Sequence, residues 1–224
     1  MEPLEIRALF DLSHTIADAL FDGYTYPWEV LPQIHDFILK LGKTLPADRF
    51  NSPAEGVWIA KSATVAPSAC INGPCIIDEN AEIRHCAFIR GNAIVGKNAV
   101  VGNSTELKNV VLFDNVQVPH YNYVGDSVLG FRAHMGAGSI TSNVKSDKTL
   151  VEIGSFGSRI ATGMKKIGAM LGDGAEIGCN SVLNPGTVIG RGSIVYPTSC
   201  VRGVVAENCI YKSAGTIIPK INQK

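Results

Sequence analysis

The chain has 224 residues, with 20 basic and 20 acidic side chains that leave no formal net charge. Hydrophobic residues make up 46% of the chain and charged residues 18%, which excludes an intrinsically disordered protein. The absence of a basic excess argues against a nucleic-acid-binding protein, and no apolar run approaches the roughly 18 residues of a membrane span. The acidic start, residues 1–5, lacks the features of a secretory signal, and the six cysteines form no Cys-x-x-Cys pair. We therefore expect a cytoplasmic protein with reduced cysteines.

Residues 1–55 carry the apolar spacing of helices. Ser13 is placed to cap a first run, and Gly42 is placed to end a second one. The apolar positions of the two runs are Ile16, Leu20 and Phe21, then Leu31, Ile34, Ile38 and Leu41. The prediction is a helical cap over the open end of the domain that follows, with a loop over residues 43–56. A partner-binding module is the alternative for this region.

From residue 56 onwards, an aliphatic residue recurs at every sixth position. The first tract consists of Ile59, Val65, Ile71, Ile77, Ile83, Ile89, Val95, Val101 and Leu107. The second tract consists of Leu171, Ile177, Leu183, Ile189, Val195 and Val201. Small or short residues stand two positions before most of them. Six-residue periodicity is typical of a parallel β-helix, so we predict one over residues 56–205 and a C-terminal tail over residues 206–224.

The period fails between Leu107 and Gly168. Three of the six steps after Leu107 are five residues long when the apolar positions are taken as Leu112, Val118, Val124, Leu129, Met135 and Ile140. Residues 144–167 abandon the period altogether, as an excursion from the helix would. Departures from a consistent local pattern are expected at functional sites. A structural role in the repeat accounts least well for five polar residues of this segment, which are Lys108, His120, Tyr123, His134 and Asn143.

The hexapeptide pattern resembles that of hexapeptide-repeat acyltransferases. This resemblance implies a mainly β fold, a single-stranded left-handed parallel β-helix whose coils each take three hexads. The interior positions expected to stack on one face are Ile89, Leu107, Val124 and Ile140. Arg90 and Lys108 then lie directly above one another, because adjacent coils are about 4.8 Å apart. Two stacked cations favour an anion between or before them, and a phosphate is the natural one.

Three local motifs resemble the acetyltransferase part of bifunctional UDP-N-acetylglucosamine pyrophosphorylase/glucosamine-1-phosphate acetyltransferases. They are residues 106–109 (ELKN), 119–126 (PHYNYVGD) and 136–143 (GAGSITSN). Residues 159–169 (RIATGMKKIGA) look most like the archaeal-type sugar-phosphate nucleotidyltransferase branch, in which a hairpin-like excursion precedes the second repeat tract. We expect no nucleotidyltransferase domain, because residues 1–56 contain no glycine-rich nucleotide loop.

The resemblance implies an acetyl-CoA-dependent acyltransferase that N-acetylates an amino-sugar 1-phosphate for the synthesis of nucleotide-sugar and cell-envelope precursors. His120 matches the general base, and an imidazole suits proton abstraction near neutral pH. The matching acceptor-binding residues are Arg90, Lys108 and Tyr123 for the phosphate, Asn143 for the amino sugar and acetyl group, and His134, where the family commonly has asparagine. Ala137 and Cys179 match coenzyme-binding positions, and no metal is required. The implied assembly is a homotrimer with sites between subunits.

Two other classes of function are alternatives. A non-catalytic sugar-phosphate-binding or assembly protein would keep the scaffold without the reaction. A zinc carbonic anhydrase-type enzyme would need three histidines around one metal, but His85 and His120 are expected two coils apart. O-acetylation is an alternative to N-acetylation. The basic residues that could meet coenzyme phosphates are Lys165, Lys166, Arg191 and Lys212.

Overall fold

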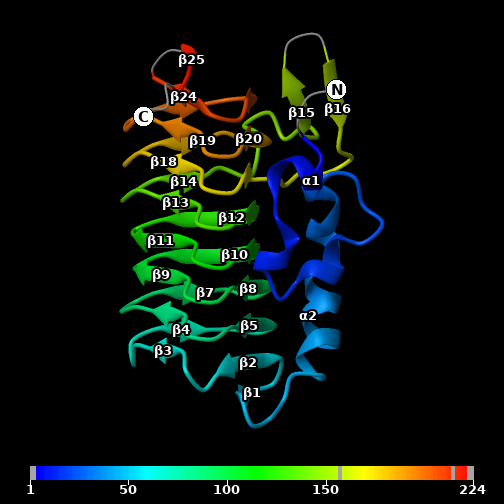
Figure 1. Cartoon of the computed structure of the whole chain (residues 1–224), viewed down its shortest axis with the longest axis vertical. Coiled ribbons are helices and arrows are strands. Elements are labelled where there is room, and N and C mark those ends of the chain that lie inside the picture. The colour runs from blue at the N-terminus through cyan, green and yellow to red at the C-terminus, as the bar shows by residue number, and fades with distance from the viewer. Residues whose placement is uncertain (1–3, 156–157, 213–214, 221–224) are drawn as a thin grey trace.

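The computed structural model describes residues 4–155, 158–212 and 215–220. The chain forms a mainly β structure, a single-stranded left-handed parallel β-helix, with a helical N-terminal region along one side (Figure 1). The predicted fold class is therefore confirmed. Regular coils contribute one short strand to each of three faces, and parallel pairing joins the equivalent strands of neighbouring coils.

The strands of the three faces follow one another along the chain. The first face contains β2 (Val57–Ala60), β5 (Cys75–Ile77), β8 (Ala93–Val95), β17 (Ala169–Leu171), β20 (Thr187–Ile189) and β23 (Val204–Val205). The second face contains β3 (Thr64–Val65), β6 (Glu82–Ile83), β9 (Val100–Asn103), β11 (Gln117–His120), β13 (His134–Met135), β18 (Glu176–Ile177), β21 (Ile194–Val195) and β24 (Cys209–Tyr211). The third face contains β4 (Cys70–Ile71), β7 (Phe88–Ile89), β14 (Ile140–Thr141), β19 (Val182–Leu183) and β22 (Cys200–Val201). The longer strands β10 (Glu106–Leu112) and β12 (Tyr123–Leu129) turn the corner from the third face onto the first.

Pairing on the third face confirms most of the predicted register. The interior residues Ile89, Leu107 and Val124 align as predicted. Ile140 was assigned to the wrong slot, because it pairs with Tyr123 and the buried Thr141 takes the interior position. The coil between β10 and β12 takes 17 residues and not 18. At the corner between the third and first faces, Asn109 and Asp126 adopt left-handed φ values of 56° and 48°, and the chain turns in one residue fewer. This shortened corner carries the candidate site.

The N-terminal region consists of two short α-helices and three 3₁₀ turns. They are α1 (Ile6–Leu9), η1 (Leu12–His14), η2 (Asp18–Phe21), η3 (Pro27–Gln33) and α2 (Ile34–Gly42). Gly42 ends the second helix as predicted, whereas the first capping side chain is Asp11, which accepts the backbone N–H of Ser13. The helices lie beside the prism and not over its open end: α2 contacts β5, β8 and β10 (Figure 1).

The outward residues of the first face explain this placement. In each of its strands the residue between two inward positions is also apolar, so the face is hydrophobic on both sides. Six of these outward residues are buried, namely Ile76, Ile94, Val111, Val128, Met170 and Val188, whereas Trp58 of β2 and Val204 of β23 are half-buried. The corresponding residues on the second and third faces include Glu82, Gln117, Glu106 and Cys200, which stay at least partly exposed. The first face is the most apolar of the three on its outer side, and the N-terminal region covers much of it.

Antiparallel strands occupy both ends of the β-helix. Strand β1 (Phe50–Ala54) pairs antiparallel with β2, so part of the predicted loop over residues 43–56 is a strand. At the other end, β24 continues the parallel stack beyond residue 205, and β25 (Ile217–Pro219) pairs with it antiparallel. An antiparallel neighbour occupies backbone groups that the terminal coil would leave unpaired.

The excursion predicted over residues 144–167 contains an antiparallel hairpin. Strand β15 (Glu152–Ser155) pairs with β16 (Ser158–Ala161), and a bridge between Val144 and Lys166 closes the base. The backbone N–H of Ile167 donates to the carbonyl of Asn143 at 3.1 Å. The chain therefore leaves the helix and returns to it at the same corner.

A buried carboxyl lies where the N-terminal region meets the first coils. Asp78 is fully buried, and its Oδ1 accepts the backbone N–H of Glu79 at 2.7 Å. Its Oδ2 has no hydrogen-bond partner in the part of the chain that the structure describes. Burial raises the pKa of this carboxyl above its ordinary value, against the smaller effects of the Glu79 N–H and of Lys97.

An Asp78→Asn substitution is expected to gain stability relative to the wild type as the pH rises. The folded-state pKa is raised, so the wild type loses stability between the unfolded-state value near 3.8 and the higher folded-state value. Asparagine does not titrate and avoids this loss. Urea unfolding of both proteins at pH 4 and pH 7 measures the difference in the free energy of unfolding. A difference that is the same at both pH values would contradict this account.

Candidate functional site

The candidate site lies at the corner between the third and first faces. Strands β10 and β12 pass through this corner, and the chain leaves β14 for the excursion at the same edge. Lys108, Asn109, Asp126 and Asn143 therefore come from three successive coils. Their side chains form one hydrogen-bonded group, which we call the Asp126 group.

Asp126 is the common acceptor of this group. It is 4% exposed, and the Lys108 ammonium lies 3.1 and 3.2 Å from its two carboxylate oxygens. The amide of Asn109 donates to Oδ1 at 3.0 Å, and that of Asn143 donates to Oδ2 at 2.5 Å. One cation and two amides thus compensate the buried negative charge, and a buried carboxylate requires such partners.

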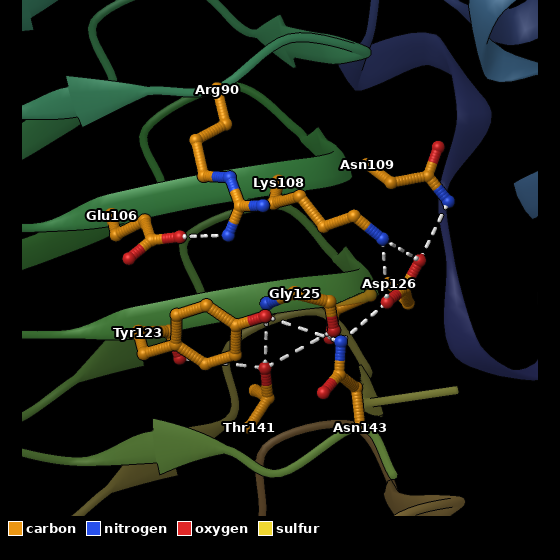
Figure 2. Close-up of polar contacts among 10 residues, drawn as sticks. Arg90, Glu106, Lys108, Asn109, Tyr123, Gly125, Asp126, Thr141 and Asn143 are labelled. Carbon is orange, nitrogen blue, oxygen red and sulfur yellow. Dashed lines mark hydrogen bonds and ion pairs between the residues drawn. The ribbon is translucent and has the colours of Figure 1, made fainter. Parts of the chain in front are cut away.

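Tyr123 places a phenol beside the same group. The amide of Asn143 donates to the phenol oxygen at 3.2 Å, as Figure 2 shows. Burial raises the pKa of Tyr123, and the charges of Asp126 and Glu106 add to the increase. The phenol therefore stays neutral and keeps its proton for donation. A side chain at Gly125 would overlap the phenol, because an added Cβ would lie 2.5 Å from its oxygen.

Arg90 and Lys108 lie on the same side of the molecule in adjacent coils, which confirms their predicted stacking (Figure 2). The Arg90 guanidinium pairs with Glu106 at 2.8 Å, and this contact raises the pKa of Arg90. Lys108 pairs with Asp126. We had predicted that a ligand anion satisfies the two cations; in the structure, two carboxylates of the chain itself do so. The reason is that both carboxylates lie one coil above the cation they pair with.

His120 lies on a different edge, at the corner between the second and third faces. It ends β11 and is exposed, and its backbone carbonyl accepts the N–H of Gly138 at 3.0 Å. Within the described residues its imidazole forms no hydrogen bond. Ala137 lies one coil above, and its carbonyl accepts the N–H of Asn180, the residue after Cys179. The predicted base and both predicted coenzyme positions thus share one edge, while the Asp126 group occupies the other.

His134 is not brought together with either group. It lies on the second face in β13, and its Nδ1 is 2.8 Å from Oε2 of Glu176 in the next coil. Around it is a shallow groove of about 370 Å³, which Gln117 and Arg132 help to line.

Sequence reasoning missed three members of the site. The motifs at residues 106–109 and 119–126 contain Glu106, Asn109 and Asp126 but indicate no role for any of them. A signal for Asp126 was present, because a glycine-aspartate pair, residues 125–126, lies at the shortened step of the period between Val124 and Leu129. The register that stacks Arg90 with Lys108 also places Glu106 in the coil above Arg90, but it does not indicate which side chains pair.

The described residues offer neither a cluster of metal ligands nor a membrane-spanning helix. Within the described ranges, no group of three or more histidine, cysteine, aspartate or glutamate residues could hold a metal ion. His85 and His120 are two coils apart, because residues 103 and 104 lie in the coil between them. Asn103 pairs with His120, and the N–H of Ser104 donates to the carbonyl of His85. No helix in the described residues is long and apolar enough to cross a membrane.

Comparison with known proteins gives related sequences and folds. Residues 71–153 match the family described as the GMPPB C-terminal domain. A bifunctional sugar-1-phosphate nucleotidylyltransferase/acetyltransferase from Sulfurisphaera tokodaii is 34% identical over 107 residues, which is 48% of this chain and 27% of that protein. A protein named bifunctional protein GlmU from Methanococcus maripaludis is 31% identical over 198 residues, 87% of this chain and 48% of its own length.

The chain thus spans about a quarter to a half of the length of these relatives. Among solved structures, the polySia-specific acetyltransferase NeuO aligns with a TM-score of 0.46 at 13% identity, over 76% of this chain and 90% of its own. The resemblance inferred from the sequence motifs is confirmed by the relatives.

Proposed function

We propose that this relative of the bifunctional sugar-1-phosphate nucleotidylyltransferase/acetyltransferases is an acetyl-CoA-dependent acyltransferase that N-acetylates an amino-sugar 1-phosphate. One observation carries the proposal. Lys108, Tyr123 and Asn143, which match acceptor-binding residues in three separate motifs, meet around Asp126 in one hydrogen-bonded group. These residues are scattered over 36 positions of the sequence, and their convergence around one charged pair at a single corner is the arrangement expected of a binding site.

In the proposed reaction, the amino group of the sugar attacks the thioester carbonyl of acetyl-CoA. The new C–N bond forms as the C–S bond breaks, the amine proton passes to the His120 imidazole, and the imidazole returns it to the leaving thiolate. The exposed position of His120 beside Ala137 suits contact with both substrates. Holding the two substrates together supplies the remainder of the rate acceleration.

The positions of the two residue groups at opposite edges of the third face support a homotrimer with sites between subunits. His120 and the Asp126 group border this face on opposite sides of one chain. In a homotrimer with sites between subunits, the His120 edge of one chain would face the Asp126 edge of its neighbour. Such an arrangement would complete a site from two halves that a single chain keeps apart.

The decisive experiment incubates the protein with acetyl-CoA and a panel of amino-sugar 1-phosphates, sugar 1-phosphates and free amino sugars. Released coenzyme A thiol is followed with time. We expect release that depends on both the amino group and the phosphate of the acceptor. Release with hydroxyl-only acceptors would indicate O-acetylation, and no release with any acceptor would contradict the proposal.

A second candidate function is non-catalytic binding of a sugar phosphate. One observation favours it: the His120 imidazole has no hydrogen-bond partner among the described residues that would orient it as a base. Binding of the same acceptors without thiol release, in a protein that also fails to bind acetyl-CoA, would support this second candidate.

A further inference from the structure

A shallow pocket adjoins the Asp126 group on the side of the helical region. Its volume is about 300 Å³. It is lined by Leu31, Pro32, Asn109, Met164, Lys165 and Lys166. Asn109 belongs to both places, because it lines the pocket and donates to Asp126. The pocket therefore continues the candidate site toward the first face.

The cations of the Asp126 corner and those of the pocket differ in whether a carboxylate of the chain compensates them. Arg90 and Lys108 each have a carboxylate of the chain within 3.1 Å, so their positive charge is largely compensated. Lys165 and Lys166 are exposed, and no ion pair or side-chain hydrogen bond of the described residues involves either of them. An incoming phosphate is attracted most strongly by cations without an internal partner, because it need not displace a carboxylate.

The two lysines are held close to the Asp126 group by the backbone. Lys166 forms the bridge with Val144 that closes the excursion. Two residues later, the N–H of Gly168 donates to the carbonyl of Asp126 at 2.8 Å. On the other side, the carbonyl of Met164 accepts the N–H of Val151 at 2.8 Å. The lysines thus extend from a fixed backbone at the edge of the site, which lowers the entropy lost on binding.

We propose that Lys165 and Lys166 add two uncompensated cations to the phosphate-binding part of the acceptor site, beside Lys108 and Tyr123, and that a phosphomonoester such as a sugar 1-phosphate binds next to them over Asn109. The apolar surfaces of Leu31, Pro32 and Met164 then face the less polar side of the sugar ring. The helical region and the excursion thereby become walls of the site, and Asn109 joins them to the Asp126 group. This inference rests on the proposed function for the identity of the acceptor.

Binding measured without acetyl-CoA tests the inference separately from catalysis. Inorganic phosphate and glucosamine 1-phosphate are titrated into the full chain by calorimetry. A Lys165→Ala/Lys166→Ala double variant is expected to bind each probe about tenfold or more weakly, because two charge-assisted contacts are lost. A Lys61→Ala/Lys148→Ala double variant removes the same charge from exposed positions outside the pocket and is the matched control. We expect its affinity to change less than twofold.

Three results would overturn the inference. They are unchanged affinity in the Lys165/Lys166 double variant, an equal loss in the control, and no binding of either probe to the wild type. The proposed function fails by a different result, which is the absence of thiol release with every acceptor. Thiol release that the Lys165/Lys166 variant leaves unchanged would contradict the inference and leave the proposed function standing.

Discussion

Replacement of His120 by alanine is expected to lower the turnover number for acetyl transfer by about 10²–10⁴-fold. The imidazole is the proposed acceptor of the amine proton, and alanine offers no group that can replace it. The fold should be unaffected, because the ring is exposed and forms no hydrogen bond among the described residues. Steady-state thiol release, with kcat and KM determined for both substrates, measures the effect.

His85→Ala is the matched control for this experiment. His85 is an exposed histidine on the same edge, two coils below His120, and its only described polar contacts are made by its backbone carbonyl. The control should keep the wild-type kcat. An unchanged kcat in the His120 variant would remove His120 from the mechanism, and an equal loss in both variants would indicate a general effect on the edge.

The second large effect is expected for Asp126→Ala, which should lower the free energy of unfolding by about 3 kcal/mol. The substitution leaves the Lys108 ammonium without its carboxylate and removes the acceptor of two amides. The Lys108 side chain is 27% exposed, so water can solvate part of its unpaired charge. The expected loss is therefore at the lower end of the range for breaking a buried ion pair. Denaturant unfolding at neutral pH measures it.

Asp126→Asn separates charge from shape in the same measurement. Asparagine keeps one oxygen acceptor and the volume of the side chain, so we expect a smaller loss of stability than for alanine. Acetyl transfer should fall in both variants, because Asn143 loses the carboxylate that orders it and Asn143 in turn contacts the Tyr123 phenol. Wild-type stability in both variants would show that the Asp126 group does not hold the three coils together.

Much of the fold could be predicted because the period is a property of the chain itself. An aliphatic residue at every sixth position predicts stacked short strands, and the stacking of Arg90 with Lys108 followed directly from their spacing. The error at Ile140 arose where the period fails, because an apolar residue was preferred over the buried Thr141. Thr141 can occupy an interior slot because its hydroxyl bonds to the backbone of Gly125.

The sequence also contains a pattern that indicates where the helical region packs, which is the run of consecutive apolar residues in the strands of the first face. Most regular strands of the first face have apolar residues at three consecutive positions, as in Cys75–Ile77, which predicts burial on both sides. Helical spacing alone predicts only that a helix has an apolar side. The location of its partner surface depends on which face of the prism is itself apolar.

The sequence by itself determined the coil, its repeat and the residues that could carry chemistry. Only the tertiary structure decided that Glu106 and Asp126 neutralise Arg90 and Lys108, and that His120 lies on a different edge from Asn143. The physical reason is that periodicity records burial, which each residue experiences alone. Charge pairing and edge placement depend on the distance between residues of different coils, and that distance exists only after the coils have stacked.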